Sequence, residues 1–170
     1  MRIGSGLQLA GVSELERLLE RRNREPDQRE SVDREIRRRF ERTRATFVLD
    51  MAGFSTSVQR HGIIHHLAKI HRMRVAVEEV TRVCRGRVVK FQADNAFVTF
   101  ASVRAAVAAA IRVNELVAER NVEAAPENRI DVAIGIGFGP ILLADHDFFG
   151  DEVNWRPSSA KISPVMGRFF

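Results

Sequence analysis

Hydrophobic positions in the first third of the chain follow the spacing of helices. Ser13 precedes a charged segment in which Leu15, Leu18 and Leu19 share one face, and this pattern predicts a helix capped by Ser13 and ended near Pro26. A second helix is predicted from residue 27 or 31 to about residue 44. Its apolar residues recur every four positions: Val32, Ile36 and Phe40. Each helix has one narrow apolar stripe, which fits either an exposed helix with one packed face or a coiled coil.

The remainder of the chain alternates β-rich runs with helically spaced segments. An apolar run over residues 45–51 predicts a strand, and Gly62 separates two helical segments, the second ending at the Arg85-Gly86 turn. Further along, the pattern predicts a hairpin of strands 87–91 and 96–100, a helix over 101–120, and strands 130–138 and 141–144 joined by a Gly139-Pro140 turn. The order β-α-(α)-β-β-α-β-β predicts an α+β fold, a ferredoxin-like antiparallel sheet with helices on one face, preceded by a helical segment.

Charge and length narrow the function classes. The 170 residues suffice for one domain with a hydrophobic core and a helical appendage. The net charge of +5 comes almost wholly from arginine, since Lys69, Lys90 and Lys161 are the only lysines. The arginines of the first 44 residues alternate with glutamates, which favours a salt-bridged exposed helix. Nucleic-acid binding is the less favoured alternative, because aromatic residues that could stack on bases are scarce there.

Cysteine and histidine usage indicate no structural metal or disulfide. Cys84 is the single cysteine, so we expect a reducing, cytoplasmic environment. His61 and His65 have the spacing of a helical ligand pair, but no third ligand accompanies them, so packed or surface histidines are expected. The N-terminus lacks the apolar core of a signal peptide, and no apolar run approaches about 18 residues, so no membrane segment is expected.

One stretch, residues 46–55, carries the strongest chemical signal. Its apolar run delivers Asp50 to the end of a predicted strand, just before Gly53. Taken alone, this pattern is common in α/β proteins, where many strands end with an aspartate before a glycine turn and the aspartate has only a structural role. A second acid, Asp94, lies on the predicted hairpin, which can neighbour the first strand. Two carboxylates that meet at one end of a sheet can hold a pair of divalent cations about 3.5–4 Å apart, and such a pair can bind nucleotide phosphates.

Four segments together resemble the class III nucleotide cyclase catalytic domain. They occur in the order of that family's motifs between residues 45 and 154. The segments are Phe47-Val-Leu-Asp50-Met-Ala-Gly53-Phe54-Ser55, Val89-Lys90-Phe-Gln-Ala93-Asp94-Asn-Ala-Phe, Val132-Ala-Ile-Gly135-Ile-Gly137-Phe-Gly139-Pro140 and Phe149-Gly150-Asp-Glu-Val153-Asn154.

The resemblance implies a role for each matching residue. Asp50 and Asp94, with the Met51 carbonyl, correspond to the ligands of two Mg²⁺ or Mn²⁺ ions. Lys90 and Asp147 correspond to the residues that read the purine, and lysine with aspartate is the adenine-type pair. Further correspondences are the amides of Ala52, Gly53, Phe54 and Ser55, which face the triphosphate, and Asn154, which orients the ribose.

The implied enzyme is an adenylate cyclase that converts ATP to 3′,5′-cyclic AMP and pyrophosphate. In this family one subunit supplies the metal ligands and the other reads the base, so a head-to-tail homodimer is expected. A regulatory partner could act through the N-terminal helices. The alternative is an impaired remnant, or a regulatory domain that dimerises and binds nucleotide without turning it over.

The resemblance breaks after Asn154. The family has a basic residue four positions later, where this chain has Ser158, and the family's final strands with a second phosphate-binding lysine have no counterpart. We therefore expect a truncated domain whose residues 155–170 are an aberrant tail, read out of frame. The predicted division is a helical segment over 1–44, a cyclase-like domain over 45–154 and this tail.

Overall fold

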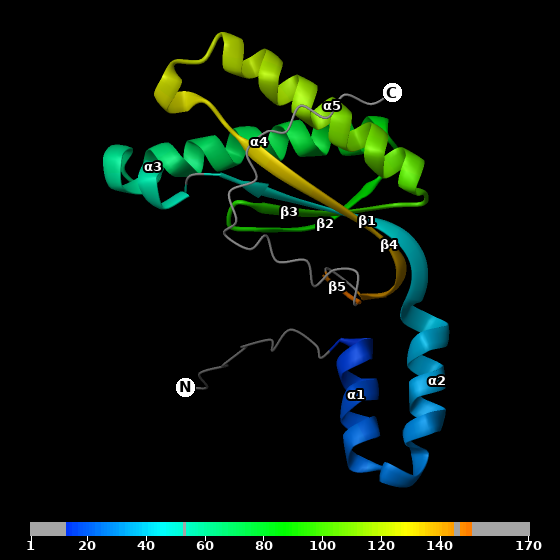
Figure 1. The fold of residues 1–170 in the computed structure, drawn as a ribbon. Coiled ribbons are helices and arrows are strands. Elements are labelled where there is room, and N and C mark those ends of the chain that lie inside the picture. The colour runs from blue at the N-terminus through cyan, green and yellow to red at the C-terminus, as the bar shows by residue number, and fades with distance from the viewer. Residues whose placement is uncertain (1–12, 53, 145–146, 151–170) are drawn as a thin grey trace, which may run out of the picture.

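The structure, a computed structural model, describes residues 13–52, 54–144 and 147–150. Figure 1 shows a curved sheet with α4 and α5 lying on one face, and a pair of helices, α1 and α2, extending from the other end of the molecule. The helices are α1 Glu14–Arg24, η1 Pro26–Gln28, α2 Arg29–Phe40, α3 Phe54–His61, α4 Ile63–Val83, α5 Val103–Val122 and η2 Pro126–Asn128. The strands are β1 Glu41–Met51, β2 Arg87–Gln92, β3 Asn95–Phe100, β4 Val132–Ala144 and β5 Asp147–Phe149.

The five strands form one sheet in the order β2-β3-β1-β4-β5, and every pair is antiparallel. The succession β1-α4-β2-β3-α5-β4 with this strand order is a ferredoxin-like arrangement, to which β5 adds an edge strand. The predicted α+β fold, with helices on one face of an antiparallel sheet, is confirmed.

The main core lies between the sheet and the two long helices. Because successive residues of a strand point to opposite faces, Phe47, Leu49 and Met51 of β1 face α4 and α5 and are buried there. Phe47 and Phe100 meet edge to face, with ring centroids 6.1 Å apart. The alternation leaves Asp50 on the opposite face, which we call the open face of the sheet.

The N-terminal helices pack against each other and against the end of the sheet. Ser13 and Glu16 make a capping box at the start of α1, and Arg22 of α1 pairs with Asp33 of α2 at 2.5 Å. A small apolar cluster joins these helices to the end of β4: Leu15, Leu18, Val32, Ile36, Phe40, Leu142 and Ala144. The predicted apolar stripes therefore pack against each other and against the sheet through Leu15, Leu18 and the residues of α2, whereas Leu19 is 42% exposed. Among the described residues no helix is long and apolar enough to cross a membrane.

The structure corrects two predicted boundaries. The second helix was expected to reach residue 44, but it ends at Phe40, and residues 41–44 begin β1 by pairing with 139–142 of β4. The predicted turn at Gly139-Pro140 is wrong, because β4 continues through it with Pro140 opposite Thr43. Proline is tolerated in a strand at an edge, and β5 pairs with β4 only from Leu142 onward, so β4 is still an edge strand at Pro140. The short strand β5 was not predicted.

In the turn between α4 and β2, substitutions at two adjacent residues, Arg85 and Gly86, should change the stability of the protein in opposite directions. Gly86 lies against the buried ring of Phe100, and a Cβ at this position would be 2.4 Å from the ring. Gly86→Ala should therefore lower the free energy of unfolding by about 1–3 kcal/mol. Arg85 has a φ of 54°, in the left-handed region that favours glycine. Arg85→Gly should therefore raise the free energy of unfolding by about 1 kcal/mol. Urea denaturation of both variants checks this, and a neutral Gly86→Ala would contradict the packing.

Candidate active site

Asp50 lies near the end of β1, on the open face. Its neighbours across the sheet are Ala133 of β4 and, by the register that pairs Leu49 with Ala96, Asn95 of β3. The next residue of β3's hairpin turn is Asp94. The topology that the sequence predicted therefore brings the two acids to the same end of the sheet.

The electrostatics of Asp50 reflect this placement. Burial of the Asp50 carboxyl group raises its pKa above the usual value, and the negative charge of Asp94 raises this pKa further. A backbone hydrogen bond at Met51 opposes the shift. The two carboxylates repel each other, so a cation bound between them would offset this repulsion.

The donor set fits a hard divalent cation. Carboxylate and backbone carbonyl oxygens are the ligands that Mg²⁺ and Mn²⁺ prefer, and Asp50, Asp94 and the Met51 carbonyl supply that chemistry. Within residues 13–52, 54–144 and 147–150 no group of three or more His, Cys, Asp or Glu side chains is placed to hold a metal ion. Remaining ligands would have to come from phosphates, water or backbone.

The predicted phosphate-facing turn is described in part. The Ala52 amide donates to the Asp131 carbonyl at 2.9 Å, so in this structure it is already engaged. Phe54 and Ser55 open α3, where backbone amides lack partners within the helix and can bind an anion. Gly53 lies outside the described residues, as does Asn154.

Lys90 and Asp147, the predicted second half of the site, lie together in the structure. They come from the two opposite edge strands, β2 and β5, and the Lys90 Nζ lies 2.8 Å from an Asp147 carboxylate oxygen. The ammonium group also lies 5.0 Å from the centroid of the Phe97 ring, its partner across the hairpin. The backbone amide of Phe148 donates to the Asp147 carboxylate at 2.8 Å.

Curvature of β4 makes this contact possible. The strand bends so that β5 returns beneath the sheet toward β2 (Figure 1). Phe148 then packs edge to face on Phe97, with ring centroids 6.0 Å apart, and Ile141 and Val89 are buried beside them. This apolar cluster includes Val89 and Phe148, which are adjacent in sequence to Lys90 and Asp147, so its packing holds the two strands that carry the ion pair together. Sequence reasoning selected both polar residues but missed the cluster.

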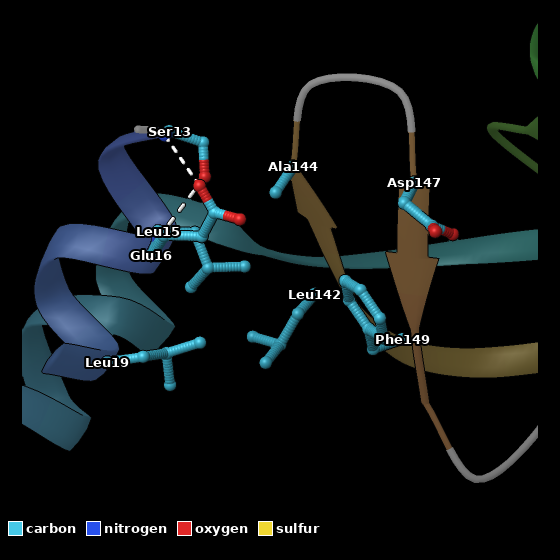
Figure 2. A pocket seen from close by; sticks show the side chains of 8 residues that line it. All are labelled: Ser13, Leu15, Glu16, Leu19, Leu142, Ala144, Asp147 and Phe149. Carbon is cyan, nitrogen blue, oxygen red and sulfur yellow. Dashed lines mark hydrogen bonds between the residues drawn. The ribbon is translucent and has the colours of Figure 1, made fainter. Parts of the chain in front are cut away.

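A cavity of about 500 Å³ lies beside Asp147, between α1 and the β4–β5 hairpin. Figure 2 shows Leu15 and Leu19 facing Leu142 and Phe149 across it, while the Asp147 carboxylate points away from α1. Its largely apolar lining does not suit a triphosphate. The candidate site is therefore the open face, and the cavity belongs to the junction with the N-terminal helices.

Two of the histidines, His61 and His65, have structural contacts. His65 Nε2 lies 3.0 Å from the Glu127 carbonyl, and the rings of His61 and His65 are 5.0 Å apart. Lys69 and Arg72, further along α4, donate to carbonyls of the same loop, those of Glu127 and Asn128. These side chains hold the loop before β4.

The burial of Asp50, together with its repulsion from Asp94, gives a stability prediction. Asp50 has a raised pKa, so its ionised form disfavours the folded state, and stability falls as pH rises through that pKa. At neutral pH, Asp50→Asn should therefore raise the melting temperature of the metal-free protein. Added Mn²⁺ should stabilise the wild type but not this variant. The exposed Asp131→Asn serves as the control, and a metal-free Asp50→Asn less stable than wild type would contradict the repulsion.

Comparisons with known proteins concern the sequence and the fold of the chain. No family model matches the chain. A curated relative from Rhizobium meliloti (strain 1021), named "Putative adenylate cyclase 3", is 30% identical over 119 residues, which cover 70% of this chain and 20% of the relative. The chain thus spans about a fifth of that protein.

Solved structures of cyclases share the fold of the described domain. An adenylate/guanylate cyclase/hydrolase from Silicibacter pomeroyi is 28% identical with a TM-score of 0.57, covering 67% of this chain and 66% of that one. A bacterial light-regulated adenylyl cyclase has a TM-score of 0.61 at 19% identity, with 67% and 66% covered. Guanylyl cyclases are also among the similar structures. The fold is that of adenylyl and guanylyl cyclase catalytic domains, and together with the similar sequence it confirms the predicted resemblance to the class III nucleotide cyclase catalytic domain.

Proposed function

We propose that this domain is an adenylate cyclase. The observation that carries the proposal is the Lys90–Asp147 pair, held at 2.8 Å on a supporting apolar cluster. Adenine offers an exocyclic amine as donor and ring nitrogens as acceptors, so a carboxylate and an ammonium group complement it. Guanine has a carbonyl oxygen in place of that amine, and this oxygen would face the Asp147 carboxylate without a proton between them.

In the proposed reaction the ribose 3′ oxygen attacks the α-phosphorus of ATP. A bond forms between these atoms, the bond from the α-phosphorus to the bridging oxygen breaks, and pyrophosphate leaves. The hydroxyl proton passes to solvent. Asp50, Asp94 and the Met51 carbonyl would hold two Mg²⁺ or Mn²⁺ ions, which when bound lower the pKa of the attacking hydroxyl and neutralise phosphate charge.

The chain's own residues would orient the substrate. Amides of the turn at residues 52–55 would face the triphosphate, with those of Phe54 and Ser55 at the start of α3 the best placed. Lys90 and Asp147 would exchange their mutual ion pair for bonds to the adenine. Asn154, outside the described residues, is proposed to orient the ribose.

We further propose that two copies assemble head to tail. The face of the sheet away from α4 and α5 carries both the acid pair and the base-reading pair, so a second copy laid against it could combine one half-site from each subunit. The α1–α2 pair, packed on the end of β4 close to Asp147, offers a place where a regulatory partner could act.

A non-catalytic domain is the second candidate. The observation in its favour is the sequence after Asn154, where Ser158 stands in place of a basic residue. Loss of one group that stabilises transition-state charge can cost about 10²–10³ in rate. Such a domain would bind nucleotide and dimerise without turnover.

The decisive experiment measures cyclic AMP formed by the full 170-residue chain from Mn²⁺-ATP, with Mn²⁺-GTP in parallel. We expect cyclic AMP in excess of cyclic GMP and none from Asp50→Ala. A version with residues 155–170 restored to the alternative reading frame should be faster. Activity in neither version would reject the cyclase proposal, whereas activity only in the restored version would favour the non-catalytic reading of this chain.

Base recognition has its own test. Lys90→Met removes a charged hydrogen-bond donor to the adenine, a contact worth about 1.5–3 kcal/mol, so KM for ATP should rise roughly 10–100-fold. The matched control is Lys69→Met, since Lys69 bonds the Glu127 carbonyl on another part of the molecule. Steady-state kinetics with both nucleotides measure the effect, and an equal loss in both variants would exclude a specific role for Lys90.

A further inference from the structure

Arg74 reaches from α4 to the hairpin turn that carries Asp94. Its guanidinium group donates to the Ala93 carbonyl at 2.9 Å and lies 5.2 Å from the centroid of the Phe91 ring. Its Nε is buried and has no hydrogen-bond partner among the described residues. The side chain is thus fixed by the aromatic ring on one side and by the turn on the other.

The turn that Arg74 holds is under backbone strain. Gln92 pairs with Asn95, which leaves Ala93 and Asp94 as a two-residue loop. Ala93 has φ of 51°, in the left-handed region. For a residue with a Cβ this conformation costs roughly 1–2 kcal/mol, and it persists where the surroundings enforce it. The hydrogen bond from Arg74 fixes the carbonyl of this strained residue.

The carbonyl of Ala93 belongs to the peptide that links it to Asp94. This peptide is planar, so fixing the carbonyl also fixes the positions of the Asp94 nitrogen and Cα. The orientation of the peptide in turn limits the directions in which the Asp94 side chain can point. The hairpin lies at the sheet's edge beside the end of β1, where Asp50 is found. A change in the turn would move Asp94 relative to Asp50.

We propose that Arg74 is a positioning residue for the metal site, holding the β2–β3 turn so that Asp94 meets Asp50 at the spacing a divalent cation requires. The inference rests on the proposed function for the identity of the ligand. Arginine suits the task because its planar group can stack on Phe91 while it donates along a fixed direction, which lysine cannot do. Partners of metal ligands commonly account for 10–100-fold in metal affinity.

The test titrates Mn²⁺ by electron paramagnetic resonance in the presence of 3′-deoxy-ATP, which lacks the attacking hydroxyl. Arg74→Met should weaken Mn²⁺ binding about 10–100-fold, and Arg74→Lys should lie between it and wild type. The matched control is Arg72→Met, since Arg72 also clasps a loop carbonyl from α4, that of Asn128, away from the acids. It should leave Mn²⁺ affinity unchanged. Where cyclic AMP forms, Arg74→Met should raise the half-saturating Mn²⁺ concentration while kcat at saturating Mn²⁺ stays near wild type.

A second readout needs no metal. Amide hydrogen exchange at Asp94 and Asn95 should be faster in Arg74→Met and unchanged in Arg72→Met, at a temperature where both are folded. If Arg74→Met does not fold, Arg74→Gln takes its place, because it keeps a donor but not the stacked charge.

The outcomes separate this inference from the proposed function. Unchanged Mn²⁺ affinity in Arg74→Met, or an equal loss in Arg72→Met, overturns the inference whether or not cyclic AMP forms. A wild type that forms no cyclic AMP yet binds Mn²⁺ in an Arg74-dependent way supports the inference and counts against the cyclase proposal. A wild type that binds no Mn²⁺ overturns both.

Discussion

Pairing of β1 with β4 is the constraint on which the rest of the structure depends. The two strands pair over eleven positions, from Glu41 with Leu142 to Met51 with Val132. One end of this ladder receives the N-terminal helices, and the other end presents Asp50. Three glycines of β4 lie across from Val48, Thr46 and Arg44 of β1: Gly135, Gly137 and Gly139. They leave part of the open face without side chains and allow the strand to bend.

That bend links the two halves of the candidate site. Asp50 depends only on the straight part of β1, whereas Asp147 reaches Lys90 because β4 curves and carries β5 beneath the sheet. The cluster of Phe97, Phe148 and Ile141 fills the space inside the curve. The packing of the α1–α2 pair on Leu142 and Ala144 lies on the outer side of the same segment. A displacement of the helices would thus act on the curved half of the site and leave the acid pair in place.

The sequence predicted what depends on local pattern. Alternating apolar residues and turn chemistry predicted the β2–β3 hairpin, and topology alone placed Asp94 near Asp50. The continuation of β4 through Gly139-Pro140 was missed because the dipeptide is typical of a turn, and only pairing with residues about 100 positions earlier overrides it. Residues 41–44, the charged start of β1, were predicted as helix because their local pattern is helical and only their pairing with residues 139–142 makes them a strand. The contact of Lys90 with Asp147 depends on strand curvature, and that of Arg74 with Ala93 depends on helix placement, which no local pattern specifies. The role of Asn154 stays a prediction.

The ion pair between Lys90 and Asp147 also has a consequence for ligand binding, because a ligand that contacts these side chains has to replace the bond between them. In the proposed role of the pair, an entering base would have to offer a donor to the carboxylate and an acceptor to the ammonium group at once, because replacing only one bond would leave the other charge partly buried without a partner. In that role, a ligand that matches half of the pair would bind less well, because part of a partly exposed ion pair would be given up without replacement. Under the proposed assignment, discrimination between purines begins in the resting state, before any phosphate contact is made.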